Sequence, residues 1–274
     1  MKFAFYSAAL GDEALDQVAA WAGSAGFDAL EVDFIRHLNL ANDWHSAIRS
    51  VRQQDLEVCA ITLFGNLLDS NQTQRDRLRE QARELAFFAV ESGVPAIVLF
   101  PGRDDSLSEE ENYQNLATFF QALLQEAPTV RILIENWPGP NKRYIATTPE
   151  GWRKMFQLVP GLGLEFDPSH LIWQNIDPMS AAEEFINWIF LVHGKDTEIS
   201  GNPADPIRPW QYRLPGRGAM SWPDFFGVLS SGGYDGTISI EHEDADFGWP
   251  KGPVGKRKEG LSLGLKNLKH SAKQ

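Results

Sequence analysis

The sequence is poor in cysteine and has no long apolar run. Its single cysteine, Cys59, excludes an internal disulfide and lies in an apolar stretch, which is typical of a small buried hydrophobic residue. No apolar run approaches the roughly 20 residues that a transmembrane helix needs. The N-terminal segment turns acidic within a dozen residues, and no signal-peptide cleavage site follows it. We therefore expect a cytoplasmic protein without a membrane partner.

Excess positive charge is also missing, because the formal net charge at pH 7 is −12. Nucleic-acid binding draws most of its affinity from clustered Lys and Arg, so this charge balance argues against a nucleic-acid partner. Residues 251–274 are an exception: they hold seven Lys/Arg against one Glu, a local +6 that leaves −18 on residues 1–250. The basic end of a helix is usually a solvated face that suits the helix dipole, and a phosphate or partner site is the alternative.

Internal repeats and low-complexity linkers are absent as well, and strand-like and helix-like segments alternate along the whole chain. Ser108 and Glu111 form an expected capping box, and Gly26, Gly93 and Gly233 stand where helices should end. We expect eight strands, at residues 3–7, 29–34, 58–64, 96–100, 131–137, 162–167, 190–195 and 237–243. We expect helices between them at residues 12–25, 43–54, 72–92, 108–126, 148–158, 180–188 and 221–231.

The predicted strands are nearly continuous apolar runs, which is typical of a parallel sheet covered on its outer face. The first strand is not followed by the glycine-rich turn of a dinucleotide-binding sheet, which disfavours an open doubly wound fold. Eight strand–helix units with short links favour an α/β fold of the (β/α)₈ TIM-barrel type. Because such barrels reach this length as one domain, we expect residues 1–274 to form a single domain.

One connection breaks the pattern of short links. Residues 196–220 are rich in Gly, Pro and aromatic residues, and long loops without secondary structure are uncommon in compact domains unless they are functional. This connection follows the seventh predicted strand. We therefore expect a long loop over the C-terminal mouth of the barrel, where such folds place their sites.

Four predicted strands carry polar residues at or near their ends: Glu135, Asp167, His193 and Glu241. In a barrel these ends converge on one mouth, and a mixed oxygen and nitrogen set suits Mn²⁺, Mg²⁺, Co²⁺ or Zn²⁺. Three carboxylates so close together can all stay ionised only around a cation. We therefore predict a divalent metal site formed by these four residues.

Other interpretations exist for individual members of this set. Asp167 followed by Pro168 is also typical of a helix N-cap, and His193 could be a histidine buried in the core. Glu135 and Glu241 follow apolar strand residues, where burial without partners would be unfavourable. Glu165 should lie one layer deeper than Asp167, and Asp196 could simply begin the loop.

The order of short motifs adds a resemblance that spans nearly the whole chain. The motifs are Glu135-Asn136, Asp167-Pro168-Ser169-His170, His193-Gly194-Lys195-Asp196, Pro215-Gly216-Arg217-Gly218, Tyr234-Asp235-Gly236 and Ile240-Glu241-His242-Glu243-Asp244. In this order they resemble the sugar phosphate isomerase/epimerase superfamily of xylose-isomerase-like barrels. The resemblance implies a divalent metal held by Glu135, Asp167, His193 and Glu241. It also implies that His170 and an arginine of the segment from Arg213 to Arg217 contact substrate oxygens.

Two departures bear on the substrate. The loop before Pro215 is longer than in the ketohexose 3-epimerase branch, and it contains Trp210 and Tyr212. The ending Glu241-His242-Glu243-Asp244 resembles inositol-catabolism relatives more than those epimerases.

We therefore expect an isomerase or epimerase that acts on a ketose, keto-sugar or keto-inositol through an enediolate. Glu135 and Glu241 would exchange the proton beside one divalent ion, with Mn²⁺ as the first choice, and no further cofactor is expected. Lys195, Arg213 and Arg217 would bind substrate together with His170. Trp137, Trp173, Trp210 and Trp249 could pack on the apolar face of a sugar, although core or interface packing is an equal alternative.

Three alternative functions remain open at this stage. A dehydratase or lyase of a keto-inositol or 3-keto-glycoside would share the first proton abstraction. A metal-dependent endonuclease is disfavoured by the charge of −18 on residues 1–250, and a non-catalytic sugar-binding barrel is the third alternative. Association into a homo-oligomer is also open.

Overall fold

The computed structural model describes residues 1–200 and 210–274. Its hydrogen-bonded strands follow one another as a closed parallel barrel in the order β1-β10-β7-β6-β5-β4-β3-β2, which confirms the predicted (β/α)₈ TIM-barrel fold. The barrel strands are β1 (Lys2–Tyr6), β2 (Ala29–Asp33), β3 (Glu57–Leu63), β4 (Ala96–Leu99), β5 (Arg131–Glu135), β6 (Gly163–Phe166), β7 (Ile189–His193) and β10 (Thr237–Ile240). None of the helices in these two ranges is both long enough and apolar enough to cross a membrane.

Helices connect the strands, and their ends follow the predicted signals. The helices are α1 (Leu15–Ala25), α2 (Trp44–Arg52), α3 (Gln72–Ser92), α4 (Glu109–Glu126), α5 (Pro149–Leu158), α6 (Pro168–Ile172), α7 (Pro178–Phe185), α8 (Trp222–Ser231) and α9 (Val254–Ser271), with short turns η1 (Ser7–Leu10), η2 (Phe34–Leu38) and η3 (Ala245–Phe247). Both bonds of the Ser108 capping box are present, and Gly26 and Gly93 end α1 and α3 with left-handed backbone. Gly232 caps α8, one residue earlier than predicted.

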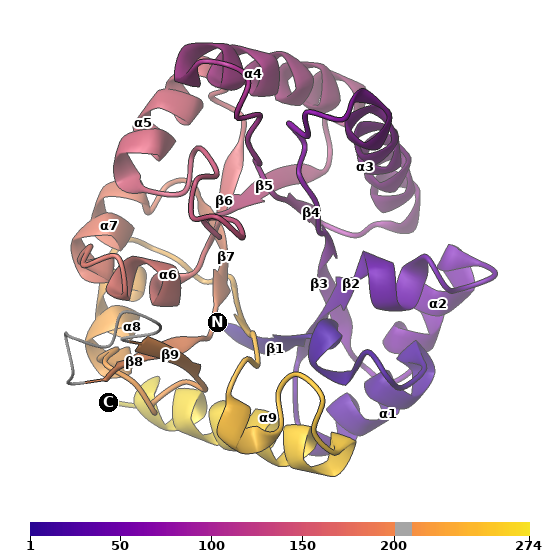
Figure 1. Ribbon diagram of the computed structural model, residues 1–274. Coiled ribbons are helices and arrows are strands. Elements are labelled where there is room, and N and C mark those ends of the chain that lie inside the picture. Colours follow the sequence, from indigo (N-terminus) through magenta and orange to yellow (C-terminus); the bar gives the residue numbers. More distant parts are fainter. Residues whose placement is uncertain (201–209) are drawn as a thin grey trace. The chain divides into compact units, whose positions relative to one another are not determined.

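The chain divides into two compact units, and the first consists of Met1–Val58 and Phe166–Gln274. In it β1 pairs with β2 and β10, and β10 pairs with β7. Helix α9, drawn in yellow, packs against α8, η1 and β10 (Figure 1). Arg257 and Lys258 on this helix form ion pairs with Asp12 and Glu13. Part of the basic charge near the C-terminus is therefore neutralised within the chain.

The second unit is Cys59–Glu165. In it β4 pairs with β3 and β5, and Glu135 of β5 lies opposite Glu165 of β6. Helix α3 packs against β4, and α4 packs against β5 (Figure 1). The residues of β4 are all buried, as expected for a strand of a parallel sheet that is covered on its outer face.

The predicted long loop needs a correction. Within residues 196–220, strands β8 (Asp196–Ile199) and β9 (Trp210–Arg213) form an antiparallel hairpin in which Thr197 lies opposite Tyr212. The β-branched and aromatic residues of these strands favour extended backbone, which the Gly and Pro content of the segment concealed. Residues 201–209, which include the predicted loop residues Asn202, Pro203 and Pro209, lie outside the described residues.

Several barrel strands are also shorter than predicted. The ladder stops at Glu135, His193 and Ile240, so Lys195 and Glu241 lie beyond the strand ends. The predicted strands were too long because the residue pattern continues past the last hydrogen bond between neighbouring strands, so the sequence does not show where a strand ends. The polar residues after β6, β7 and β10 therefore stand on connecting segments, where their side chains can turn toward each other.

Candidate active site

Asp167 follows β6 and forms the N-cap of α6. Its Oδ1 accepts the backbone N–H of Ser169 at 2.8 Å, and Pro168 takes the first helical position, so the N-cap interpretation is confirmed. The other oxygen, Oδ2, lies 3.2 Å from His170 Nε2, 3.3 Å from Lys195 Nζ and 3.6 Å from His193 Nδ1. Because the cap uses Oδ1, it leaves Oδ2 directed at this group of side chains.

His193 ends β7 and is 2% exposed. Its Nε2 lies 3.2 Å from Oε2 of Glu31, which comes from β2. Its Nδ1 lies 3.3 Å from Glu241 Oε2 and 3.6 Å from Asp167 Oδ2. Since a carboxylate oxygen accepts hydrogen bonds, we assign the proton of the His193 ring to Nε2 from this contact. The lone pair of Nδ1 then faces two carboxylates.

This donor set fits a divalent cation. One ligand atom each from Asp167, His193 and Glu241 lies within 4.8 Å of the others, and all three side chains are mostly or fully buried. The carboxylate oxygens of Asp167 and Glu241 and the Nδ1 of His193 all present lone pairs to one buried place, where they repel each other unless a positive charge lies among them. A nitrogen and two carboxylate oxygens suit the transition metals and zinc better than calcium.

Lys195 contributes the nearest positive charge. Its buried Nζ lies 2.6 Å from Glu241 Oε2 and 2.7 Å from Glu243 Oε2. Burial alone would lower the pKa of Lys195, but Glu241, Glu243 and Asp167 together raise that pKa well above its usual range. One ammonium among three carboxylates still leaves an excess of negative charge, which a divalent ion would offset.

The ionisable groups around Asp167 have strongly shifted pKa values. Burial works to raise the pKa of Glu241, but the ammonium of Lys195 outweighs it and lowers that pKa to about 2. Burial likewise opposes ionisation of Asp167, yet the neighbouring Nε2–H of His170 and the ammonium of Lys195 hold its pKa well below the usual range. Burial lowers the pKa of His170 to about 3, so this ring is neutral at pH 7.

The motif around Pro215 proves to be a support for Asp196. The carboxylate of Asp196 accepts the N–H groups of Thr197, Gly216 and Met220 at 2.9, 3.1 and 3.0 Å, as well as the indole N–H of Trp222 at 3.3 Å. A Cβ at Gly218 would lie 2.3 Å from Asp196 Oδ1, so only glycine fits there. Asp196 thus holds both ends of the connection after β7.

Arg213 and Arg217 lie in a different group of contacts from Asp167 and Glu241. Arg213 pairs with Glu198 at 2.7 Å and with Asp244 at 3.1 Å. Arg217 also pairs with Asp244, and it pairs with Asp246 at 3.0 Å. These contacts join the β8–β9 hairpin to the segment after β10, and the role of both arginines in substrate binding stays a prediction.

Glu135 ends β5 in the second unit. It is 2% exposed, and its Oε2 accepts the backbone N–H of Trp137 at 2.8 Å. Glu165 is fully buried opposite it in the strand register. The ligand and catalytic roles of Glu135 stay predictions.

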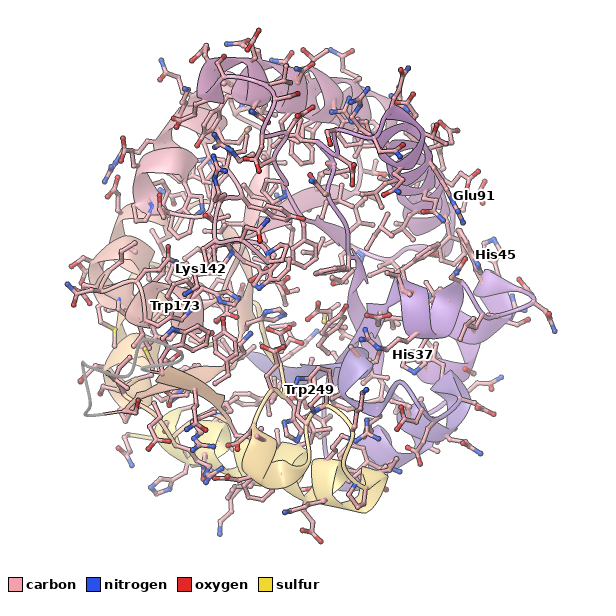
Figure 2. All side chains as sticks on the ribbon, in the orientation of Figure 1. His37, His45, Glu91, Lys142, Trp173 and Trp249 are labelled. Atoms are coloured by element: carbon pink, nitrogen blue, oxygen red, sulfur yellow. The ribbon has the colours of Figure 1, made fainter. Side chains whose placement is uncertain are left out.

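The predicted aromatic residues fall into separate groups. Trp173 and Trp210 stack with ring centroids 4.9 Å apart, and the ring centroids of Trp249 and His242 are 6.4 Å apart. Figure 2 labels Trp173 and Trp249. In the second unit Trp137 packs against Phe64 at 5.1 Å and against Tyr144 at 5.6 Å.

Sequence reasoning missed Glu31 and Glu243. Glu31 stands in an apolar strand, as Glu135 does, but the prediction rests on the polar residues of the last four strands only. Glu243 lies two residues after Glu241, and extended backbone places both on the same side. The period-two alternation of side chains along extended backbone would have identified both residues as candidates.

The fold and this buried cluster define a TIM barrel with acidic and histidine side chains gathered after its strands. Residues 19–269 match the model of the xylose isomerase-like TIM barrel family, and the chain belongs to that family. The predicted resemblance to sugar isomerase and epimerase barrels is therefore confirmed.

The curated proteins that are similar to the chain include the following two. One is the uncharacterized protein YfiH of Bacillus subtilis, which is 28% identical over 89% of the chain and 93% of its own length. The other is an inosose dehydratase of Lacticaseibacillus casei, 23% identical over 76% of the chain and 70% of its own length.

Solved structures share the fold. The IolI protein, solved with a bound zinc atom, has a TM-score of 0.79 at 17% identity and covers 99% of this chain and 98% of its own. D-psicose 3-epimerase of Clostridium cellulolyticum, solved with D-tagatose, has a TM-score of 0.77 at 14% identity and covers 99% of both chains. The relatives thus include enzymes of the epimerase and dehydratase types.

Proposed function

We propose that this protein is a divalent-metal-dependent isomerase or epimerase of a ketose, keto-sugar or keto-inositol. The observation that carries the proposal is the Nδ1 of His193, which faces the carboxylates of Asp167 and Glu241 at 3.6 and 3.3 Å. Such a convergence of buried acceptor atoms is typical of a metal site. The epimerase and dehydratase names among its relatives support a small carbohydrate substrate.

Asp167, His193 and Glu241 would hold the ion, and we propose Glu135 as the fourth ligand from its position at the end of β5. Mn²⁺ is the first candidate, with Mg²⁺, Co²⁺ and Zn²⁺ as alternatives. A bound divalent ion polarises a carbonyl and stabilises negative charge on its oxygen. Glu31 would keep the ring of His193 in the orientation that presents Nδ1.

The proton transfer is assigned to the two glutamates. Glu241 is ionised at pH 7, as a base requires, and would take the proton from the carbon next to the carbonyl. Glu135 would return a proton to the same carbon from the other side, which inverts it. Lys195 stays protonated and would donate a hydrogen bond to a substrate oxygen from its place 2.6 Å from Glu241.

A dehydratase or lyase of a keto-inositol or 3-keto-glycoside is the second candidate. The similarity to an inosose dehydratase over 76% of the chain favours it. The first proton abstraction is the same, and the reactions differ in whether a β-oxygen leaves. The endonuclease alternative is disfavoured by the acidic charge, and the cytoplasmic location and a homo-oligomeric state stay predictions.

The test is a screen of keto-sugars and keto-inositols with the Mn²⁺-loaded protein in D₂O. Isomerisation or epimerisation predicts a product of unchanged composition that carries deuterium next to the carbonyl. A product that has lost water or an aglycone would identify the lyase instead. If no compound in the screen takes up deuterium, the proposed proton transfer is wrong.

A further inference from the structure

Tyr212 lies on β9 of the hairpin, and its hydroxyl joins two side chains from the α6 segment. Its Oη is 2.8 Å from Nδ1 of His170 and 3.3 Å from Nε1 of Trp173, which Figure 2 labels. The rings of Tyr212 and His170 meet edge to face at 5.3 Å. This hydroxyl group is therefore one of the contacts that join the hairpin to the segment that carries Asp167, beside the stacked rings of Trp210 and Trp173 and the bond from Thr197 Oγ1 to the carbonyl of Ser169.

The chemistry of these groups fixes the direction of each hydrogen bond. An indole N–H can only donate, so Tyr212 Oη accepts from Trp173. The hydroxyl has one proton, which is then directed at Nδ1 of His170. Because Nδ1 accepts, the proton of the neutral ring is on Nε2, which lies 3.2 Å from Oδ2 of Asp167.

The four side chains thus form a directed chain from Trp173 through Tyr212 and His170 to Asp167. Each link has a donor on one side and an acceptor on the other. Hydrogen bonds aligned in one direction polarise each other and fix the orientation of each member. The last acceptor in this series of hydrogen bonds is Oδ2 of Asp167, the oxygen that faces His193 and Lys195.

We propose that Tyr212 is a positioning residue for Asp167, acting through His170, so that docking of the β8–β9 hairpin sets the orientation of a metal ligand. This inference rests on the proposed function in taking Asp167 as a ligand. Groups that orient the ligands of a metal typically change its affinity by about 10- to 100-fold when they are removed.

The Tyr212→Phe variant isolates the hydroxyl, because the aromatic ring next to Trp210 and under Lys195 is kept. We expect this variant of the full chain to bind Mn²⁺ about 10-fold more weakly, measured by competition with a chromophoric chelator. The matched control is Tyr234→Phe, which removes a buried hydroxyl that bonds to the carbonyl of Thr237 at the start of β10. This control should keep the Mn²⁺ affinity of the wild type.

Nitrogen-15 NMR of the metal-free protein provides a second measurement that packing alone would not move. We expect the wild-type spectrum to show His170 as the Nε2–H tautomer, and Tyr212→Phe to shift the ring toward a mixture of tautomers. A wild-type His170 with its proton on Nδ1 would overturn the proposal. So would a Tyr212→Phe variant that keeps both the wild-type tautomer and the wild-type affinity. A wild type that binds no Mn²⁺ would instead count against the proposed function. The tautomer of His170 would still test the hydrogen-bond chain from Trp173 to Asp167.

Discussion

At the scale of single residues, the most informative contact is the one between Glu31 and His193. This contact assigns the proton of the ring to Nε2, so that in the proposed site the other nitrogen, Nδ1, would be the one that binds the metal. The charge pattern of the last four strands predicted His193, Asp167 and Glu241 as ligands, because a polar residue after an apolar strand is recognisable in the sequence. Glu31 of β2 could not be predicted as the partner of His193, because their contact depends on how the strands are arranged around the barrel, and the local sequence pattern does not show that arrangement.

Glu31→Gln should weaken Mn²⁺ binding by about 10- to 100-fold, because the amide no longer enforces the Nε2–H form of His193. Chelator competition measures this change. Glu57→Gln is the matched control, since Glu57 is exposed and pairs with Lys2 at the other end of the barrel strands. Equal affinities in the two variants would contradict the assigned role of Glu31.

Glu241→Gln and Glu135→Gln should each lower the rate of deuterium exchange next to the substrate carbonyl by about 100-fold or more, because an amide cannot carry the proton. Mass spectrometry of substrate recovered from D₂O gives the rate. Glu198→Gln, on the exposed side of the hairpin, should exchange at the wild-type rate. Near-normal exchange in either of the first two variants would remove that glutamate from the mechanism.

At the scale of elements, the β8–β9 hairpin is tied to the segment after β10 by Asp244. This buried carboxylate accepts from Arg213 and Arg217 and from the backbone N–H of Leu214 at 3.2 Å. Asp246 contacts both arginines too, but it is 55% exposed. Asp244 is therefore the main anchor of the hairpin.

Asp244→Asn should lower the free energy of unfolding by about 3 kcal/mol, because it removes the buried charge that both arginines and the N–H of Leu214 share and leaves the arginines only partly exposed carboxylates. Asp246→Asn should change it by less than about 1 kcal/mol, because water screens the exposed pair. Urea titrations of both variants compare the two. A similar loss in both would show that Asp244 is not the anchor.

The elements themselves were largely predictable. The eight barrel strands and the helices between them follow from apolar runs, caps and glycines, as the Ser108 capping box and Gly93 show. The hairpin was not predictable, because its strands pair with each other and lie among Gly and Pro residues. Lys195 was expected to face substrate, but its three carboxylate neighbours arise only when β6, β7 and β10 are brought together.

At the scale of the whole molecule, stability should depend on pH through buried neutral histidines. Burial lowers the pKa of His242 from 6.5 to about 4. Below pH 6.5 the unfolded chain binds a proton that the folded chain does not, so the free energy of unfolding falls as the pH drops toward 4. The slope from one such group is roughly 1.4 kcal/mol per pH unit.

His242→Asn should therefore flatten the fall in unfolding free energy of the metal-free protein between pH 6 and about 4.5 by about that slope. Urea titrations at several pH values measure it. His270→Asn is the control, because His270 is exposed on α9 and should leave the wild-type dependence in place. An unchanged slope in His242→Asn would show that His242 is not responsible.

The central claim is that Asp167, His193 and Glu241 hold one divalent ion, and metal content tests it most directly. The protein is loaded with excess Mn²⁺, passed through gel filtration, and measured by mass spectrometry alongside His193→Gln and the control His270→Asn. We predict about one ion per chain in the wild type and the control, and less than about 0.1 in His193→Gln. A wild type that retains no metal, or a His193→Gln variant that retains as much as the wild type, would contradict the claim.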